Sequence, residues 1–185
     1  CPGGALAVPE GDQIIPVVNA YIERFIAAGV PIYVSRDWHP ERSVHFTDYG
    51  GQWPPHCIQN TAGAAFRPDL HVPEQATIIS KGMRPEEDAY SNFEGFTPDG
   101  ERFADRLARD GVTHLYVCGL ATDYCVRASV LDALRHGIAV TLLIDAVRGV
   151  DVVPGDSERA IAEMLAAGAK AGTLESVHPE DRRRS

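Results

Sequence analysis

The 185-residue sequence is poor in basic residues: 17 Lys and Arg stand against 26 Asp and Glu, for a formal net charge of −9. Its only run of basic residues is Arg182–Arg184, at the very end. This deficit argues against nucleic acid or an anionic membrane surface as a partner. A small, neutral or weakly charged substrate fits the composition better, and self-association into a homo-oligomer stays open.

Long hydrophobic runs are also missing. No apolar segment approaches the ~20 residues that a membrane-spanning helix needs, and no charged, apolar and small-residue pattern of a signal peptide opens the chain. We therefore expect a cytoplasmic protein that neither crosses nor binds a membrane.

Cysteine is scarce, with Cys1, Cys57, Cys118 and Cys125 as its only occurrences. None forms a C-x-x-C pair, so a disulfide scaffold, a zinc ribbon and a thioredoxin-like redox site are all disfavoured. Phosphate-binding glycine signatures, internal repeats and low-complexity linkers are absent too. The composition predicts a single domain over residues 1–185 with free thiols.

What is present is an alternation of short β-branched runs with helical patterns. Strands are predicted at 30–36, 76–81, 112–119, 138–145 and 171–174, and helices from a cap at Asp12 to a stop at Gly29 and at 99–111, 122–136 and 154–168. This order predicts a doubly wound α/β fold, with a mostly parallel sheet and helices on both faces. The long irregular segment from 38 to about 75 is of the kind that usually carries function.

Reactive side chains follow three of the predicted strands. Asp37 ends the first strand, Lys81 ends the second, and Cys125 lies six residues beyond Gly119, which ends the third. Ligands of open α/β sheets bind outside the carboxyl ends of the strands. The sequence therefore predicts one site that combines these groups.

One carboxylate and several imidazoles gather just after the first strand. Asp37, His39 and His56 form a ligand set that suits Zn, Fe or Mn and leaves positions open, and His45 is a possible further ligand. The alternative is that they are ordinary polar loop residues, since D-x-H alone is a weak pattern. Their density in a His-poor chain favours a metal site.

Two residues have an inert alternative that the spacing alone leaves open. Near the start of a predicted helix, Cys125 would feel the helix dipole, which lowers a thiol pKa, or it would simply pack as a small hydrophobe. Lys81 is one of only two lysines in an arginine-rich chain, which indicates a need for a compact ammonium, yet a lysine after a strand is commonly a solvated end. Cys118, inside an apolar strand, is predicted to lie in the core.

Five collinear motifs carry a family resemblance. CPGGALAVPEGD, SRDWHP, QWPPHCIQNTAGA, ISKG followed by DAYSNFEG, and GLATDYCVRAS together resemble the nicotinamidase and pyrazinamidase branch of the isochorismatase-like cysteine hydrolases. The resemblance covers most of the chain. It implies a Rossmann-like three-layer fold and an amidase that converts nicotinamide, and pyrazinamide, to the carboxylic acid and ammonia.

The resemblance also implies roles for residues near the third strand. Cys125 would attack the carboxamide carbon and form a thioester, which water then cleaves. Lys81 would lie beside the thiol, and the backbone N–H groups of Ala121 and Cys125 would form the oxyanion hole. A cis peptide bond between Leu120 and Ala121 is expected there.

The metal ligands carry over by resemblance to Asp37, His39 and His56, with His45 matching a ligand that only some members have. One divalent ion, Zn foremost and Fe or Mn as alternatives, would hold the pyridine nitrogen of nicotinamide. Aromatic positions of the ring pocket correspond to Trp53, Tyr90 and Tyr124. For Tyr90, plain core packing is an equally good interpretation.

One family element has no counterpart here. The third member of the catalytic triad is an aspartate on a strand directly before the CPGG motif, and this sequence begins at Cys1. We therefore expect an N-terminally truncated chain in which two neighbouring strands lack a partner. Alternatives that remain are another carboxamide or carbamoyl amidase, a non-catalytic metal- or ligand-binding remnant without the base, and a non-haem iron oxygenase.

Overall fold

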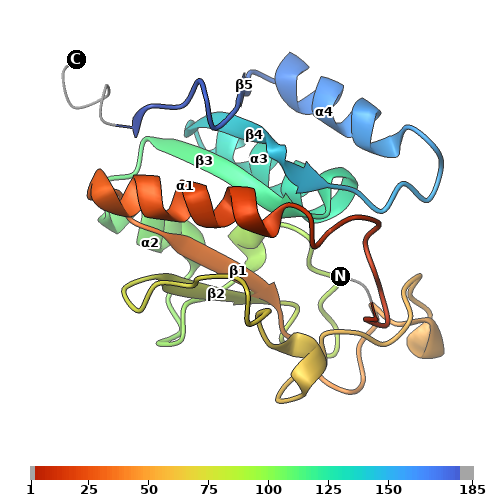
Figure 1. Cartoon of the computed structure of the whole chain (residues 1–185). Coiled ribbons are helices and arrows are strands. Elements are labelled where there is room, and N and C mark those ends of the chain that lie inside the picture. Colours follow the sequence, from red (N-terminus) through yellow and green to blue (C-terminus); the bar gives the residue numbers. More distant parts are fainter. Residues whose placement is uncertain (1–2, 180–185) are drawn as a thin grey trace.

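The computed structural model describes residues 3–179 (Figure 1), so Cys1 and the Arg182–Arg184 run lie outside the described residues. Five strands are β1 (Tyr33–Asp37), β2 (Thr77–Lys81), β3 (His114–Leu120), β4 (Ala139–Arg148) and β5 (Lys170–Gly172). The α-helices are α1 (Ile15–Ala27), α2 (Phe103–Arg109), α3 (Arg127–Arg135) and α4 (Asp156–Ala166). Within residues 3–179, no helix is both long and apolar enough to cross a bilayer.

The strands form two parallel ladders, which confirms the predicted parallel α/β class. One ladder joins β1 to β2, and the other has the order β3-β4-β5. In the described part of the chain, β1 pairs with β2 alone, and β3 pairs with β4 alone. A cavity of about 120 Å³ lies between these strands, bordered by Asp37 and Cys118 among others.

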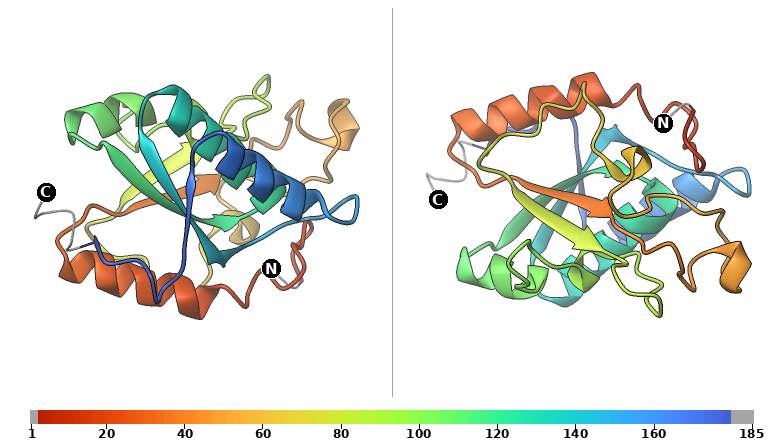
Figure 2. Two further views of the ribbon diagram at one scale, coloured as in Figure 1. Left: turned by 90° about the horizontal axis from the view of Figure 1, so that it is seen from above. Right: turned by 90° about the horizontal axis from the view of Figure 1, so that it is seen from below.

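Two apolar clusters cover the opposite faces of the strands, so the fold has three layers. Residues of α2, α3 and α4 pack with Ile79 and Leu142 in the larger cluster, whereas α1 packs with Leu143 and Ala146 in the smaller one. Leu142 and Leu143, which are successive residues of β4, thus point to opposite sides, as the pleat requires. Figure 2 shows α1 on one side of the strands and α2 and α3 on the other.

The first helix is shorter than predicted at its start. The N-cap position of α1 is Ile14, with no side-chain cap, and Asp12 instead accepts the Ile15 N–H through its backbone oxygen at 3.2 Å. Turns precede the helix, and Pro16 in the first turn needs no N–H acceptor. The predicted stop is confirmed: Gly29 adopts φ 65°, a left-handed conformation that glycine tolerates well.

The central strands end irregularly where the reactive groups are. The β3–β4 register shifts between Val117 and Gly119, so β4 continues to Arg148, beyond the predicted end at residue 145. Gly119 has φ 117° at this shift, a conformation that L side chains rarely adopt. The irregular segment after β1 is confirmed, because only two short 3-10 turns interrupt it, at Thr47–Tyr49 and Ala62–Ala64.

Candidate catalytic and metal site

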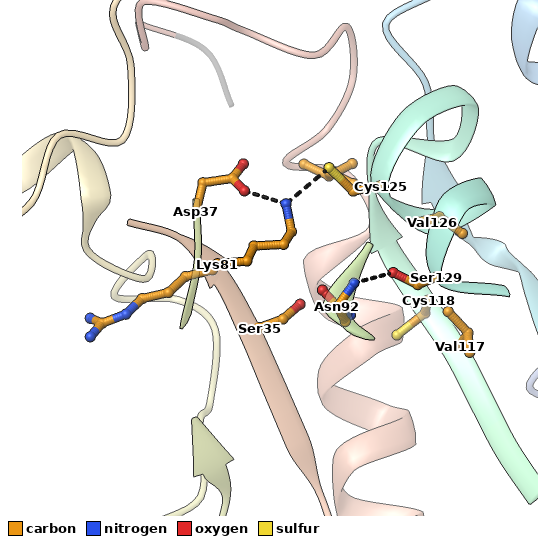
Figure 3. A pocket seen from close by; sticks show the side chains of 11 residues that line it. Ser35, Asp37, Lys81, Asn92, Val117, Cys118, Cys125, Val126 and Ser129 are labelled. Carbon is orange, nitrogen blue, oxygen red and sulfur yellow. Dashed lines mark hydrogen bonds and ion pairs between the residues drawn. The ribbon is translucent and has the colours of Figure 1, made fainter. Parts of the chain in front are cut away.

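Three reactive side chains meet at the carboxyl ends of the strands, as predicted. Lys81 closes β2 and places Nζ 3.3 Å from Sγ of Cys125, which lies in the turn that follows β3. The same ammonium forms an ion pair with Asp37 at the end of β1. Figure 3 shows these three side chains pointing toward one another. The solvated alternative for Lys81 is wrong, because the residue is only 3% exposed.

Burial and ion pairing set the charges of this group. Burial alone would lower the pKa of Lys81, but Cys125 and Asp37 outweigh it, so the pKa is raised and the ammonium is kept. Burial opposes ionisation of Asp37, yet Lys81 holds the pKa of that carboxyl below its usual range. For Cys125, burial raises the pKa and Lys81 only partly offsets it. The predicted lowering of the thiol pKa is therefore not found in the free protein, because the effect of burial outweighs that of the ammonium.

The turn that carries Cys125, Thr122–Val126, is a π-helical turn, which corrects the predicted regular helix from residue 122. Its defining bond runs from the Val126 N–H to the Ala121 carbonyl at 3.0 Å. The peptide bond between Leu120 and Ala121 is cis, as predicted. A backbone hydrogen bond from Ala121 reaches the thiol of Cys125 and favours its ionised form. The N–H that resemblance assigns to the oxyanion hole thus already faces the sulfur.

Three histidine side chains of the irregular segment lie together. The rings of His39, His45 and His56 can each offer a nitrogen, and these ligand atoms lie within 4.8 Å of one another. One nitrogen of each ring already has a partner. His39 Nδ1 contacts the Gly82 carbonyl at 3.1 Å, His56 Nδ1 the Pro54 carbonyl at 2.8 Å, and His45 Nδ1 the Asp88 carboxylate.

This arrangement fits a divalent metal. Nδ1 partners of this kind fix the ring of a ligating histidine and leave its Nε2 for the ion. His39 Nε2 is buried without any hydrogen-bond partner, an arrangement that is costly unless something binds there. Burial lowers the pKa of His39 to about 4 and also lowers that of His56, so both rings are neutral at pH 7 and have a free lone pair.

Asp37 is placed differently from the prediction. Its carboxylate groups with His56 and Cys57 within 4.8 Å, whereas His39 belongs to the group of three imidazoles. The predicted set of Asp37, His39 and His56 is thus divided between two overlapping groups that share His56. The physical reason is that Asp37 is drawn to the Lys81 ammonium.

The three predicted ring-pocket aromatics lie side by side next to the imidazoles. Trp53 donates its ring N–H to the Tyr90 hydroxyl at 2.9 Å, and its ring centroid is 4.8 Å from that of Tyr124. Tyr90 stacks on Tyr124 at 5.9 Å and lies 5.3 Å from the His45 ring. The three side chains therefore pack together beside the imidazole cluster.

Two contributors to the site were missed from sequence. Gly82, at φ 63°, leaves room for the His39 ring, because an added Cβ would lie 2.5 Å from its Cε1 atom. Asp88 orients His45. Both residues lie in motifs quoted for the resemblance, but a neighbouring glycine and an isolated acid carry no signal of a contact with a residue some forty positions away. His114 lies apart from this site, because it opens β3 and contacts Thr141.

Comparisons with known proteins match almost the whole chain. The model of the isochorismatase domain family matches residues 1–176. The nicotinamidase of Escherichia coli K12 is 40% identical over 193 residues, which cover 94% of this chain and 89% of that protein. The pyrazinamidase of Pyrococcus horikoshii, solved in complex with zinc, superposes with a TM-score of 0.86 at 52% identity, covering 94% and 92% of the two chains.

A third similarity is to PnC1 from L. infantum, solved in complex with nicotinate. It superposes with a TM-score of 0.80 at 32% identity, and the match covers 95% of this chain and 87% of that one.

Proposed function

Since the chain belongs to the isochorismatase family, in its nicotinamidase and pyrazinamidase branch, we propose that it hydrolyses nicotinamide, and pyrazinamide, to the carboxylic acid and ammonia. The observation that carries the proposal is the contact of 3.3 Å between Lys81 Nζ and Cys125 Sγ beside an imidazole cluster. An oxygenase would need the imidazoles but would leave this buried ammonium and thiol without a role.

In the proposed reaction, Sγ of Cys125 forms a bond to the carboxamide carbon. The sulfur loses its proton, the amide nitrogen gains one, and ammonia leaves as the C–N bond breaks. Water then attacks the thioester, which releases the carboxylic acid and restores the thiol. Both halves of the reaction use the same carbonyl carbon, so one binding position serves the whole cycle.

The surroundings of Cys125 favour these steps once substrate displaces water. The Lys81 ammonium donates to the sulfur and stabilises the thiolate as it forms, which partly offsets the effect of burial on the pKa. The backbone N–H groups of Ala121 and Cys125 would donate to the oxyanion, a term worth about 10²–10³ in rate in comparable enzymes. The proton acceptor that the resemblance implies is an aspartate on a strand before the CPGG motif, and no described residue matches it by motif.

We further propose that His39, His45 and His56, with Asp37 at their edge, hold one divalent metal ion, Zn²⁺ foremost and Fe²⁺ or Mn²⁺ as alternatives. The ring nitrogens gathered within 4.8 Å of one another and the unpartnered His39 Nε2 support this. When bound, the ion would supply a Lewis-acid position for the pyridine nitrogen of the substrate. Trp53, Tyr90 and Tyr124 would enclose the ring.

The remaining proposals concern the protein as a whole. We propose a single hydrolase domain over residues 1–185, acting in the cytoplasm on a small molecule, with neither nucleic acid nor membrane as a partner. The family match over residues 1–176 and the net charge of −9 support this. Light scattering would measure whether the protein self-associates into a homo-oligomer.

The decisive experiment is an assay of ammonia release from nicotinamide and from pyrazinamide. Untreated protein, chelated protein, and chelated protein given back Zn²⁺, Fe²⁺ or Mn²⁺ are compared. We expect turnover of both amides, loss on chelation, and recovery with at least one ion. An aliphatic carbamoyl amide is the matched control, and turnover of that compound in preference to nicotinamide would contradict the proposal.

A further inference from the structure

The nucleophile turn, Thr122–Val126, is tied to a distant part of the chain by the side chain of Asp123. Its Oδ1 accepts the Val150 N–H at 3.0 Å, and its Oδ2 accepts the Asp151 N–H at 2.8 Å. Both donors lie in the segment between β4 and α4. Two residues before the nucleophile, one carboxylate thus uses both oxygens to hold another segment.

That segment is itself fastened to α4. Asp151 adopts φ 50°, which is unusual for a residue other than glycine, and its carboxylate accepts the N–H and the hydroxyl of Ser157 at 2.8 and 2.7 Å. Gly149 lets the segments approach, because an added Cβ would lie 1.8 Å from the Ser157 hydroxyl and 3.0 Å from Asp123 Oδ1. The connection therefore runs without a gap from the turn to the first turn of α4.

A second connection fixes the other end of the turn. Arg127, which follows the turn directly, makes two hydrogen bonds to the Glu163 carboxylate on α4, at 2.6 and 2.8 Å. This pair is exposed and contributes little by itself. Asp123 is more enclosed and holds backbone rather than side chain, so it restrains the turn more tightly.

A π turn benefits from such external restraint. Its hydrogen-bond pattern is rare, and turns of this kind are common at functional sites. The turn here also has to present three groups at once, namely Sγ and the two N–H groups of Ala121 and Cys125. Displacement of reacting groups by about 1 Å can cost on the order of 10² in rate.

We propose that Asp123 is a positioning residue for the nucleophile. By holding the Val150 and Asp151 N–H groups it fixes the nucleophile turn against α4, and this sets where Sγ and the oxyanion N–H groups lie relative to the bound carboxamide. The inference rests on the proposed amidase function. It assigns Asp123 no contact with substrate, because its two oxygens are taken by the backbone of the β4–α4 segment.

Asp145 provides a matched control for a merely structural carboxylate. It too is partly buried and uses both oxygens to join separate segments, accepting the Tyr21 hydroxyl at 2.8 Å and the Leu174 N–H at 2.8 Å. These partners belong to α1 and to the segment after β5, on the face opposite the larger cluster. Removing Asp145 therefore costs stability without touching the nucleophile turn.

The test compares Asp123→Ala, Asp123→Asn and Asp145→Ala in the whole protein with its metal. For Asp123→Ala we expect kcat for nicotinamide to fall by about 30- to 100-fold while KM changes less than about threefold. Asp123→Asn keeps one oxygen as acceptor and should fall in between. Asp145→Ala should keep kcat within about twofold of the parent value, even if its melting temperature falls as much as that of Asp123→Ala.

A second measurement does not depend on nicotinamide turnover. Alkylation of Cys125 by iodoacetamide, followed by mass spectrometry of the peptide that contains it, reports how the sulfur is presented. We expect its rate to change at least about fivefold in Asp123→Ala and to stay within about twofold in Asp145→Ala. If the parent alkylates normally but releases no ammonia, the proposed function fails and the positioning role is still decided.

Equal behaviour of Asp123→Ala and Asp145→Ala in both measurements would overturn the proposal, and so would a rise in KM with kcat unchanged. Should Asp123→Ala not fold, Asp123→Asn takes its place. Parent-like kcat and alkylation in that variant, at reduced stability, would then show a purely structural carboxylate.

Discussion

The two halves of the site are built in different ways. On the thiol side, Lys81 and Cys125 lie on a strand end and on the turn of a strand–turn–helix unit, and an ion pair sets their charges. On the imidazole side, His39, His45 and His56 lie in an irregular segment, and burial lowers the pKa of His39 and of His56. Secondary structure therefore positions the first half, whereas individual hydrogen bonds to ring nitrogens position the second.

Because of this difference, the two halves are sensitive to different kinds of change. Changes of charge act most strongly on the thiol side, because its groups are buried with one another and away from water. Changes of shape act most strongly on the imidazole side, where each ring depends on one acceptor and on the space around it. Four substitutions or conditions test this contrast.

The largest effect is expected for Cys125→Ala, which removes the sulfur and leaves the imidazoles as they are. Ammonia release should fall by at least about 10⁴-fold, because no other described group can form the acyl intermediate. Metal content by elemental analysis and nicotinamide binding by calorimetry should stay close to those of the parent. Hydrolysis near the parent rate would rule out the thioester.

Next in size is the loss of the compact ammonium. Lys81→Arg keeps the charge but cannot place a planar guanidinium in the same space between Asp37 and Cys125, so kcat/KM should fall by about 10²–10³. Lys81→Met should in addition destabilise the fold by about 3 kcal/mol, since it leaves a buried carboxylate without its partner. Denaturant titration separates the two variants. Parent-like turnover by Lys81→Arg would show that the exact position of the positive charge does not matter for the reaction.

On the imidazole side, Gly82→Ala is expected to act through shape. Gly82 and Gly100 both have positive φ, 63° and 85°, so alanine at either position should cost roughly 1 kcal/mol in backbone strain. Only the Cβ at 82 would meet the His39 ring, whereas nothing lies within 4 Å of one at 100. Metal affinity, measured against a competing chelator, should fall about 10- to 100-fold in Gly82→Ala alone.

The smallest effect concerns the pH dependence of the metal-free protein. Unfolded His39 binds a proton below pH 6.5, but burial lowers its folded pKa to about 4. Because the unfolded chain then binds more protons, the free energy of unfolding should fall as the pH is lowered from 6.5 toward 4, by roughly 2–3 kcal/mol from this group. Urea titrations at pH 7 and pH 5 measure this change in the free energy of unfolding. We expect His39→Gln to reduce the pH dependence, and His71→Gln, at an exposed position, to leave the pH dependence unchanged. An unchanged slope in His39→Gln would refute the burial explanation.

Much of the fold followed from local patterns. The strand ends at Asp37 and Lys81 and the helix stop at Gly29 lie where the sequence predicts them, because apolar runs and a left-handed glycine are local signals. The prediction of Asp12 as the helix cap was wrong. Its backbone carbonyl accepts the Ile15 N–H in a turn that precedes the helix, and its side chain does not cap the helix. The end of β4 was missed because its pairing with β3 resumes only after an irregularity, in which β4 advances from Leu142 to Val147 while β3 advances from Val117 to Gly119.

Less of the site could be predicted, for a related reason. The thiol, the lysine and the histidines stand out by residue type, but their mutual geometry depends on contacts between distant segments. The pKa of Cys125 illustrates this, since helix position predicts a lowered value and burial raises it. The same holds for Gly82 and Asp88, whose roles exist only through rings some forty residues earlier.

Asp37 belongs to both halves, because it is paired with the Lys81 ammonium and its oxygen also lies within ligand distance of His56 and Cys57. A charge shared in this way couples the thiol side and the imidazole side of the site thermodynamically. An ion that binds near His56 changes the strength of the ion pair between Asp37 and Lys81, and by linkage a change in that ion pair changes the affinity for the ion. Asp37→Asn would therefore change metal affinity and thiol reactivity together. Inactivity of that variant would identify neither function by itself, and only a double-mutant cycle with Lys81 or His56 would apportion the loss.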